Sequence, residues 1–260
     1  MELVKPSISI ENLKRRAKAL AKVEGIQQSK KLQDYVLVSV DLLDVPVIVS
    51  RRILVPSTVN LEQLHGVIQI AMGWENGHLF SFEIENMPDI EYVGRFDEQS
   101  SDDDHQILKA ADMSVRQLLE GNNSSLVYRY DFGDDWRHRV VIESVQAEWA
   151  DRERCLLLDA KGLCPPEDCG GVSGYIGLLE TFGIVEEPDD FRLRNREWTK
   201  KEISGWLGRA YRPDKPVRHS DFQSRLTSFA EEYFNLDYLY QYEPNWRYGG
   251  MNPNKHYRNG

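Results

Sequence analysis

Alternation of apolar and polar residues predicts a β-hairpin near the start of the chain. Within residues 35–42 every second residue is an aliphatic side chain on one face: Val36, Val38, Val40 and Leu42. Because side chains of a strand point alternately to the two faces of a sheet, this spacing is typical of a half-buried strand. Residues 44–46, Asp-Val-Pro, provide a turn, and a second apolar run follows in residues 47–55. The pattern predicts two paired strands.

The same alternation returns in residues 126–132 and 136–147. These runs are separated by Gly133, Asp134 and Asp135, residue types that favour tight turns. A central hairpin is therefore expected. His138 shares a strand face with Trp136, so its imidazole is predicted to point toward the core, either as a ligand or general base or as a buried, hydrogen-bonded side chain.

Residues between the two hairpins have helical spacing. Asn60 and Gln63 form a capping-box pattern, and Gly73 suits the end of a helix. Residues 78–85 then alternate again, and helical patterns follow at 174–182, 198–207 and 220–234. This order predicts an α+β fold with a mixed or antiparallel sheet, a strand-strand-helix-strand start and a helical C-terminal part.

The chain is expected to divide into three parts. Residues 1–31 form a basic helical appendage with a helix over 10–23, residues 32–234 form a single α+β domain, and residues 235–260 form an aromatic-rich tail. The appendage carries seven Lys or Arg between residues 11 and 31. Such a run is either a solvated helical face or a nucleic-acid-binding arm.

The overall charge bears on the nucleic-acid interpretation. A formal net charge of −10 argues against a surface that neutralises phosphates along its whole length. No run approaches the roughly 18 to 20 apolar residues that a membrane span needs, and the first residues contain no cleavable apolar segment. We therefore expect a cytoplasmic protein without membrane partners.

Two strings are the least random parts of the sequence. They are Tyr128-Arg-Tyr-Asp-Phe-Gly-Asp-Asp-Trp-Arg-His138 and Gly162-Leu-Cys-Pro-Pro-Glu-Asp-Cys-Gly-Gly171. Together with residues 51–79, they closely resemble the plasmid pRiA ORF-3-like family, whose members occur on plasmids and as passengers of insertion elements and are sometimes labelled TnpR-like. The resemblance extends over residues 35–182. It implies a compact α+β fold and brings no established activity, and the sequence carries no serine-recombinase-like motif.

Cysteines suggest one candidate site. Three thiolates and one imidazole can hold zinc in a tetrahedral structural site, and this set would be Cys155, Cys164, Cys169 and His138. The spacing is looser than that of zinc knuckles. The alternative is that Cys155 packs as a small apolar side chain and the other two brace a turn.

Carboxylates suggest a second site. Five of them lie in the hairpin turn and in the segment 162–171 around Pro165 and Pro166, here called the Pro-Pro loop: Asp131, Asp134, Asp135, Glu167 and Asp168. If the two segments lie side by side, the cluster could bind Mg²⁺ or perform acid and base catalysis. The alternative is that the same residues serve local turn formation and helix capping.

A binding groove between the hairpin and the Pro-Pro loop is the preferred hypothesis. Paired arginines on a strand send one side chain to each face, and the inward one needs a partner. The expected lining is Arg51, Arg52, Trp74, Tyr128, Tyr130, Trp136, His138 and Tyr175. The preferred function is a non-enzymatic accessory protein of mobile elements that binds a protein partner or small ligand. The alternatives are a metal-dependent hydrolase or nuclease and a nucleic-acid accessory factor.

Overall fold

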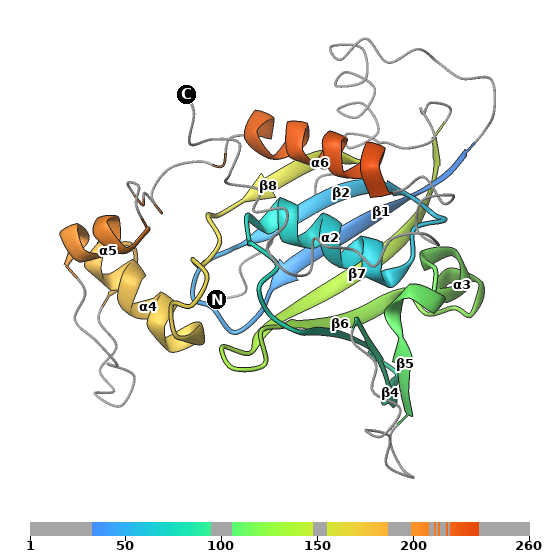
Figure 1. Cartoon of the computed structure of the whole chain (residues 1–260), viewed down its shortest axis with the longest axis horizontal. Helices are drawn as coiled ribbons and strands as arrows, with labels where there is room; N and C mark the ends of the chain where they lie inside the picture. The colour runs from blue at the N-terminus through green and yellow to red at the C-terminus, as the bar shows by residue number, and fades with distance from the viewer. Residues whose placement is uncertain are drawn as a thin grey trace, which may run out of the picture.

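One mixed β-sheet forms the centre of the described structure, a computed structural model (Figure 1). The structure describes residues 33–94, 106–147, 155–186, 199–207, 211, 213, 217 and 219–233. Within these residues the sheet has eight strands in the order β5-β4-β3-β6-β7-β1-β2-β8. The strands are β1 (Gln33–Leu42), β2 (Ser50–Pro56), β3 (Phe80–Ile84), β4 (Met87–Val93), β5 (Gln106–Lys109), β6 (Ser125–Tyr130), β7 (Trp136–Ala147) and β8 (Leu156–Lys161). Only β4 and β5 pair in parallel among them.

Helices occupy the connections and the C-terminal part. They are α2 (Leu61–Met72), α3 (Val115–Glu120), α4 (Gly171–Thr181), α5 (Lys200–Leu207), α6 (His219–Tyr233) and the short 3-10 helix η2 (Ala110–Asp112). Figure 1 shows α2 and α6 over the same face of the sheet. The predicted α+β class is confirmed, as are the strand-strand-helix-strand start and the helical C-terminal part.

The two predicted hairpins are present and are joined in one sheet. β1 pairs with β2, β6 pairs with β7, and β7 also pairs with β1. Their inward rows pack against α2, and Val38, Val40 and Ile142 are almost fully buried. Burial of this apolar row accounts for the strict register of the central strands.

Helix α2 begins and ends where the sequence indicates. The Asn60 side-chain oxygen accepts a hydrogen bond from the Gln63 amide at 2.8 Å, and the Gln63 side chain accepts one from the Asn60 amide at 2.9 Å. Gly73 ends the helix with φ 88°. Gly66 lies directly under the Phe229 ring of α6, so the two helices pack closely at this glycine.

Several elements were not predicted. Strand β4 contains a proline and has only one buried residue, β5 has four residues, and β8 begins with three consecutive leucines rather than an alternating pattern. Helix α4 begins at Gly171, three residues before the expected start, because Gly170 and Gly171 turn the chain with positive φ. The predicted helix over 10–23 and the tail over 235–260 lie outside the described residues.

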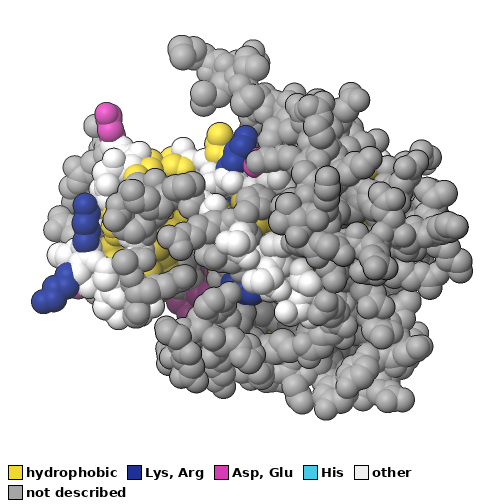
Figure 2. All heavy atoms as spheres, turned by 90° about the horizontal axis from the view of Figure 1, so that it is seen from above, with side chains coloured by type: hydrophobic (Ala, Val, Ile, Leu, Met, Phe, Trp, Pro, Cys, Tyr) yellow, Lys and Arg dark blue, Asp and Glu magenta, His cyan; other side chains and the backbone are white. Residues whose placement is uncertain are grey.

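Surface charge is scattered on the face seen in Figure 2. The Lys and Arg side chains of its described residues appear as separate points rather than as a continuous patch. Nucleic-acid binding draws its affinity from many adjacent cations.

Across the described residues, no helix combines the length and apolar character of a membrane span.

Candidate metal centre beside the central hairpin

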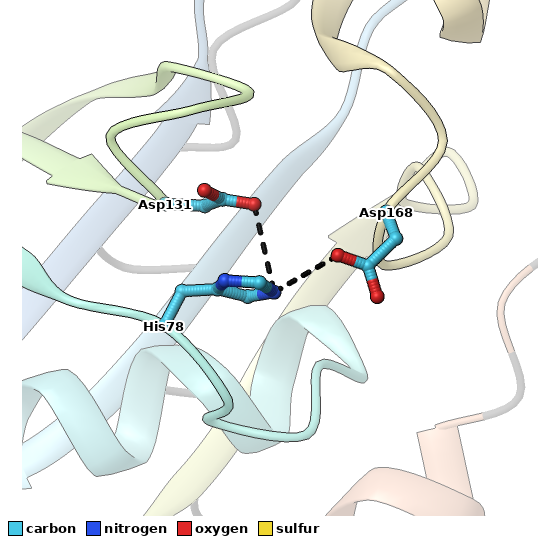
Figure 3. A group of neighbouring side chains, drawn as sticks. All are labelled: His78, Asp131 and Asp168. Carbon is cyan, nitrogen blue, oxygen red and sulfur yellow. Dashed lines mark ion pairs between the residues drawn. The ribbon is translucent and has the colours of Figure 1, made fainter.

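His78 lies among three carboxylates that come from two distant segments. Its Nε2 atom is 3.6 Å from Asp131 Oδ2, 3.6 Å from Glu167 Oε2 and 3.1 Å from Asp168 Oδ1. His78 stands in the loop between α2 and β3, Asp131 directly follows β6, and the other two belong to the loop between β8 and α4. Figure 3 shows the imidazole between Asp131 and Asp168.

The conformation of Asp131 directs one of its oxygens into this cluster. The residue adopts a left-handed backbone with φ 53°, which Asp tolerates better than most residues. Its Oδ1 accepts hydrogen bonds from the amides of Gly133 at 3.0 Å and Asp134 at 3.4 Å. This side-chain turn uses one oxygen to form the hairpin and leaves Oδ2 facing His78.

Glu167 is fixed at its other oxygen. Its Oε1 accepts hydrogen bonds from the Tyr130 hydroxyl at 2.9 Å and from the Glu75 amide at 2.7 Å. Burial is the largest influence on this carboxyl and raises its pKa. Burial also raises the pKa of Tyr130, so its hydroxyl keeps the proton that it donates. Glu167 therefore has a set orientation, with Oε2 toward His78.

The Pro-Pro loop lies against the hairpin turn. The Gly170 amide donates a hydrogen bond to Asp134 Oδ2 at 3.2 Å. At Gly171 a Cβ atom would be 2.7 Å from the Asp134 carbonyl oxygen, so only glycine allows this approach. The structure thus brings together Asp131, Glu167 and Asp168 of the five predicted carboxylates. Asp134 instead holds the loop, and Asp135 pairs with Arg129.

The separations suit a metal ion. Ligand atoms of His78, Asp131 and Asp168 all lie within 4.8 Å of one another, the one such group of three or more found in the described residues. A metal about 2.1 Å from each donor would hold neighbouring donors about 3.0 to 3.6 Å apart. One imidazole nitrogen with carboxylate oxygens is a donor set for Zn²⁺, Mn²⁺ or Fe²⁺ rather than for Ca²⁺.

The structure does not bring the expected Cys3His set together. The Cys164 thiol accepts a hydrogen bond from Arg51 at 3.0 Å and contacts Met72 Sδ at 3.1 Å, and the Cys169 thiol lies against the Gly171 carbonyl. Burial raises the pKa of all three thiols, Cys155 included, whereas zinc binds the thiolate. The Cys164 and Cys169 thiols each have partners of their own, so the Cys3His interpretation gains no geometric support.

His138 is buried, as the strand alternation predicted. Its Nδ1 is 3.3 Å from the Tyr128 carbonyl oxygen, and its ring meets Trp74 edge to face. Burial lowers the pKa of His138 from 6.5 to about 3. Its Nε2 has no hydrogen-bond partner among the described residues. The imidazole is a neutral core side chain and lies outside the His78 cluster.

The aromatic lining predicted for a groove forms part of the core instead. These residues are at most 2% exposed: Trp74, Tyr128, Tyr130, Trp136 and Tyr175. The Trp74 ring stacks on Tyr130 at 4.9 Å, and its indole N–H donates to the Pro165 carbonyl at 2.9 Å. The Pro-Pro loop and α2 close over the aromatic face, so the open groove was a wrong expectation. Only the Tyr130 hydroxyl reaches the cluster among these five side chains.

The paired arginines do point to opposite faces. Arg51 is fully buried, and its guanidinium donates to the carbonyl oxygens of Ser50, Ala71, Lys161 and Gly162 and to the Cys164 sulfur. Arg52 pairs with Asp41 at 3.0 Å on the opposite face. Arg51 therefore joins β2, α2 and the start of the Pro-Pro loop and is no part of a ligand-binding groove.

His78 is the site residue that sequence reasoning did not single out. The sequence pattern made it the first residue of the strand predicted over 78–85, whereas β3 begins at Phe80 and His78 lies in the loop before it. A weak signal was present, because His78 lies inside residues 51–79, which carry part of the family likeness.

Comparison with known proteins gives the family. The model of the plasmid pRiA4b ORF-3-like protein family matches residues 34–219. The chain belongs to this family. A relative of this pRiA4b ORF-3-like chain, the uncharacterized protein y4hQ from Sinorhizobium fredii (strain NBRC 101917 / NGR234), is 41% identical over 163 residues, which are 63% of this chain and 79% of the relative.

A solved structure shares the fold of this pRiA4b ORF-3-like protein. It is the crystal structure of MM3350, a protein of unknown function from Methanosarcina mazei Go1. The TM-score is 0.54 at 25% identity, over 71% of this chain and 94% of that one. Neither relative's description names an activity, so the likeness extends to family and fold.

Proposed function

We propose that this protein binds a divalent transition-metal ion through His78, Asp131 and Asp168. The observation that carries the proposal is the convergence of one imidazole nitrogen and three carboxylates within 3.6 Å. Without a cation, three negative charges would gather around a single histidine. A bound divalent ion would offset that repulsion.

Solvent reaches the proposed centre. The Asp168 side chain is 70% exposed and the His78 side chain 32% exposed. Three protein donors leave positions in the coordination sphere for water or for an oxygen or nitrogen of a ligand, as in metal sites that act on a ligand rather than brace a fold. The metal would then be the place where this accessory protein meets a small ligand or an exposed side chain of a protein partner. An association with mobile elements belongs to the same proposal and is supported by the plasmid in the family's name.

A metal-dependent hydrolase is the second candidate. Glu167 supports it, because this carboxylate is fixed by Tyr130 and Glu75 and presents its free oxygen to the edge of the cluster. A carboxylate beside a metal-bound water can accept its proton. In Glu167→Gln, a hydrolase would lose turnover of model esters and phosphodiesters while still binding the metal. If the metal-loaded protein has no turnover above buffer, this candidate is excluded.

Metal titration tests the main proposal. Chelator-treated protein should bind about one equivalent of Mn²⁺ or Zn²⁺ by calorimetry. His78→Gln and Asp168→Asn should each weaken binding at least tenfold, because the first replaces an imidazole nitrogen and the second a carboxylate oxygen by a weaker neutral amide. Glu143→Gln, which alters an exposed acid on β7, is the matched control and should bind as the wild type does. Absence of a stoichiometric site, or equal affinity in His78→Gln, would reject the proposal.

A further inference from the structure

We infer that His65, a buried residue of α2, is the positioning residue for His78. This inference rests on the metal centre proposed above. It begins from the loop between α2 and β3, which carries His78 and is attached to the fold by hydrogen bonds of three successive residues: Glu75, Asn76 and Gly77.

Asn76 makes the attachment to α2. It adopts a left-handed backbone with φ 57°. Its amide donates to Gln69 Oε1 at 3.0 Å, and its Oδ1 is 2.5 Å from His65 Nε2. His65 and Gln69 are four residues apart and therefore lie one above the other on the same helix face. One loop residue is thus held by two successive turns of α2.

The direction of every hydrogen bond in this network follows from the Asn76 amide. A backbone N–H can only donate, so Gln69 presents Oε1 to it and turns its NH₂ group to the Tyr128 hydroxyl, at 3.0 Å. The hydroxyl accepts there and has one proton to donate, which goes to His65 Nδ1 at 2.8 Å. His65 then carries its proton on Nε2 and donates it to Asn76.

Neutral His65 is consistent with its surroundings. The residue is fully buried, and burial lowers the pKa of its imidazole from 6.5 to about 3. The ring also stacks on Phe80 of β3 with centroids 3.6 Å apart. Ring orientation and tautomer are therefore both fixed, so the His65 Nε2–H is a rigid donor to Asn76 Oδ1.

The network continues to the site. The Gly77 amide donates to the Tyr130 hydroxyl at 3.1 Å, and that hydroxyl donates to Glu167. His78 is the next residue. The residues that precede His78 are consequently tied to His65, Gln69 and Tyr130, none of which is a proposed metal ligand. This arrangement is typical of outer residues that orient metal ligands.

Substitution of Asn76 tests this role at the loop end. Asn76→Gly removes the oxygen that His65 contacts, while glycine adopts the left-handed backbone without strain. We expect Mn²⁺ affinity to fall about tenfold or more, the range for loss of an outer partner of a metal ligand. Pulsed EPR of bound Mn²⁺ should show a weaker nitrogen signal, because His78 is no longer held in place. Tyr128→Phe, which removes only the hydroxyl that orients His65, should change both readouts in the same direction.

Ile68→Val is the control for a merely structural role. Ile68 is a fully buried residue of α2 with no part in the network, and this change lowers stability by removing one buried methyl group. Its Mn²⁺ affinity and nitrogen signal should match the wild type. If Asn76→Gly also keeps both, or if Ile68→Val loses both equally, His65 is not a positioning residue.

Hydrogen exchange separates this inference from the metal proposal. In metal-free Asn76→Gly, the Gly77 amide should exchange at least tenfold faster than in the wild type, while the interior amides of α2 stay protected. If the wild type binds no metal, the proposed function fails, but faster exchange would still show that the network holds the His78 loop. Unchanged exchange at Gly77 would overturn the positioning role regardless of metal.

Discussion

The Asp131 amide donates a hydrogen bond of 2.9 Å to the carbonyl oxygen of Leu79. This bond fixes Asp131 beside the residue that follows His78. The same aspartate forms the hairpin turn with Oδ1 and faces the imidazole with Oδ2. Turn formation and the candidate site therefore share one side chain, and substitutions can separate the two roles.

Asp131→Asn should separate them. Asparagine tolerates the left-handed backbone and keeps an oxygen acceptor for the Gly133 amide, so we expect a stability change of no more than about 0.5 kcal/mol. Mn²⁺ affinity should still fall at least tenfold, since the anionic donor is gone. Asp131→Ala loses the turn as well and should be less stable by about 1 to 2 kcal/mol. Urea unfolding and calorimetry on the same samples measure both effects. Equal affinity in Asp131→Asn and wild type would remove Asp131 from the ligand set.

Gly171→Ala should detach the Pro-Pro loop from the hairpin. This residue has φ +66°, and a Cβ would lie 2.7 Å from the Asp134 carbonyl oxygen. Gly183 is a matched control, because it has φ +69° and nothing within 4 Å of the Cβ position. The left-handed backbone alone costs an alanine about 1 to 2 kcal/mol. Gly171→Ala should exceed Gly183→Ala in lost stability and should also weaken Mn²⁺ binding. Equal losses in the two variants would mean that displacing the Pro-Pro loop from the hairpin costs no stability beyond that of the left-handed backbone.

Local patterns were sufficient to predict the central hairpins and α2. Their signals are periodicity, a capping box and turn residues, all of which lie within a few positions of one another. Strands β4 and β8 were not predicted because neither alternates: β4 has one buried residue, and three consecutive leucines at the start of β8 are all buried. The helical pattern also could not give the start of α4, which depends on how the chain turns at Gly170.

The site was predictable only in part. The hairpin turn and the Pro-Pro loop suggested that five carboxylates could converge, and the structure places three of them, Asp131, Glu167 and Asp168, beside His78. His78 could not be added, because its neighbours in space come from segments far along the chain. The alternation correctly predicted that Tyr128 faces inward. It could not predict that α2 packs over this side chain. A pattern within one strand contains no information about the element packed above it.

Arg51 should be essential for stability although it lies outside the site. Its buried guanidinium donates to four carbonyl oxygens and one sulfur. Arg51→Ala leaves these acceptors buried and unpaired, and we expect a loss of about 3 kcal/mol or more. Arg51→Lys should lose much of the same stability, because a single ammonium cannot reach the partners of a planar guanidinium. Arg52→Lys, at the partly exposed pair with Asp41, should change stability by less than about 1 kcal/mol. Chemical denaturation of the three variants measures this order, and a small loss in Arg51→Lys would contradict it.

Two buried histidines should make the fold sensitive to mild acid. Burial lowers the pKa of both His65 and His138 from 6.5 to about 3, so the folded protein holds them neutral while the unfolded chain takes up protons near pH 6.5. Their stabilising contribution is therefore complete above pH 6.5 and is lost as the pH falls toward 3. The slope reaches about 1.4 kcal/mol per pH unit for each histidine.

The pKa shift of Glu167 has the opposite effect on the pH dependence of stability. Its raised pKa means that its contribution is complete below about pH 4.5 and is lost as the pH rises through the folded value. The two histidines outweigh this single carboxyl, so the free energy of unfolding should fall between pH 7 and pH 5 in urea titrations. His138→Phe removes one titrating group and should reduce the slope by about half over that interval. A flat profile in the wild type, or an unchanged slope in His138→Phe, would show that these imidazoles are not held neutral in the core.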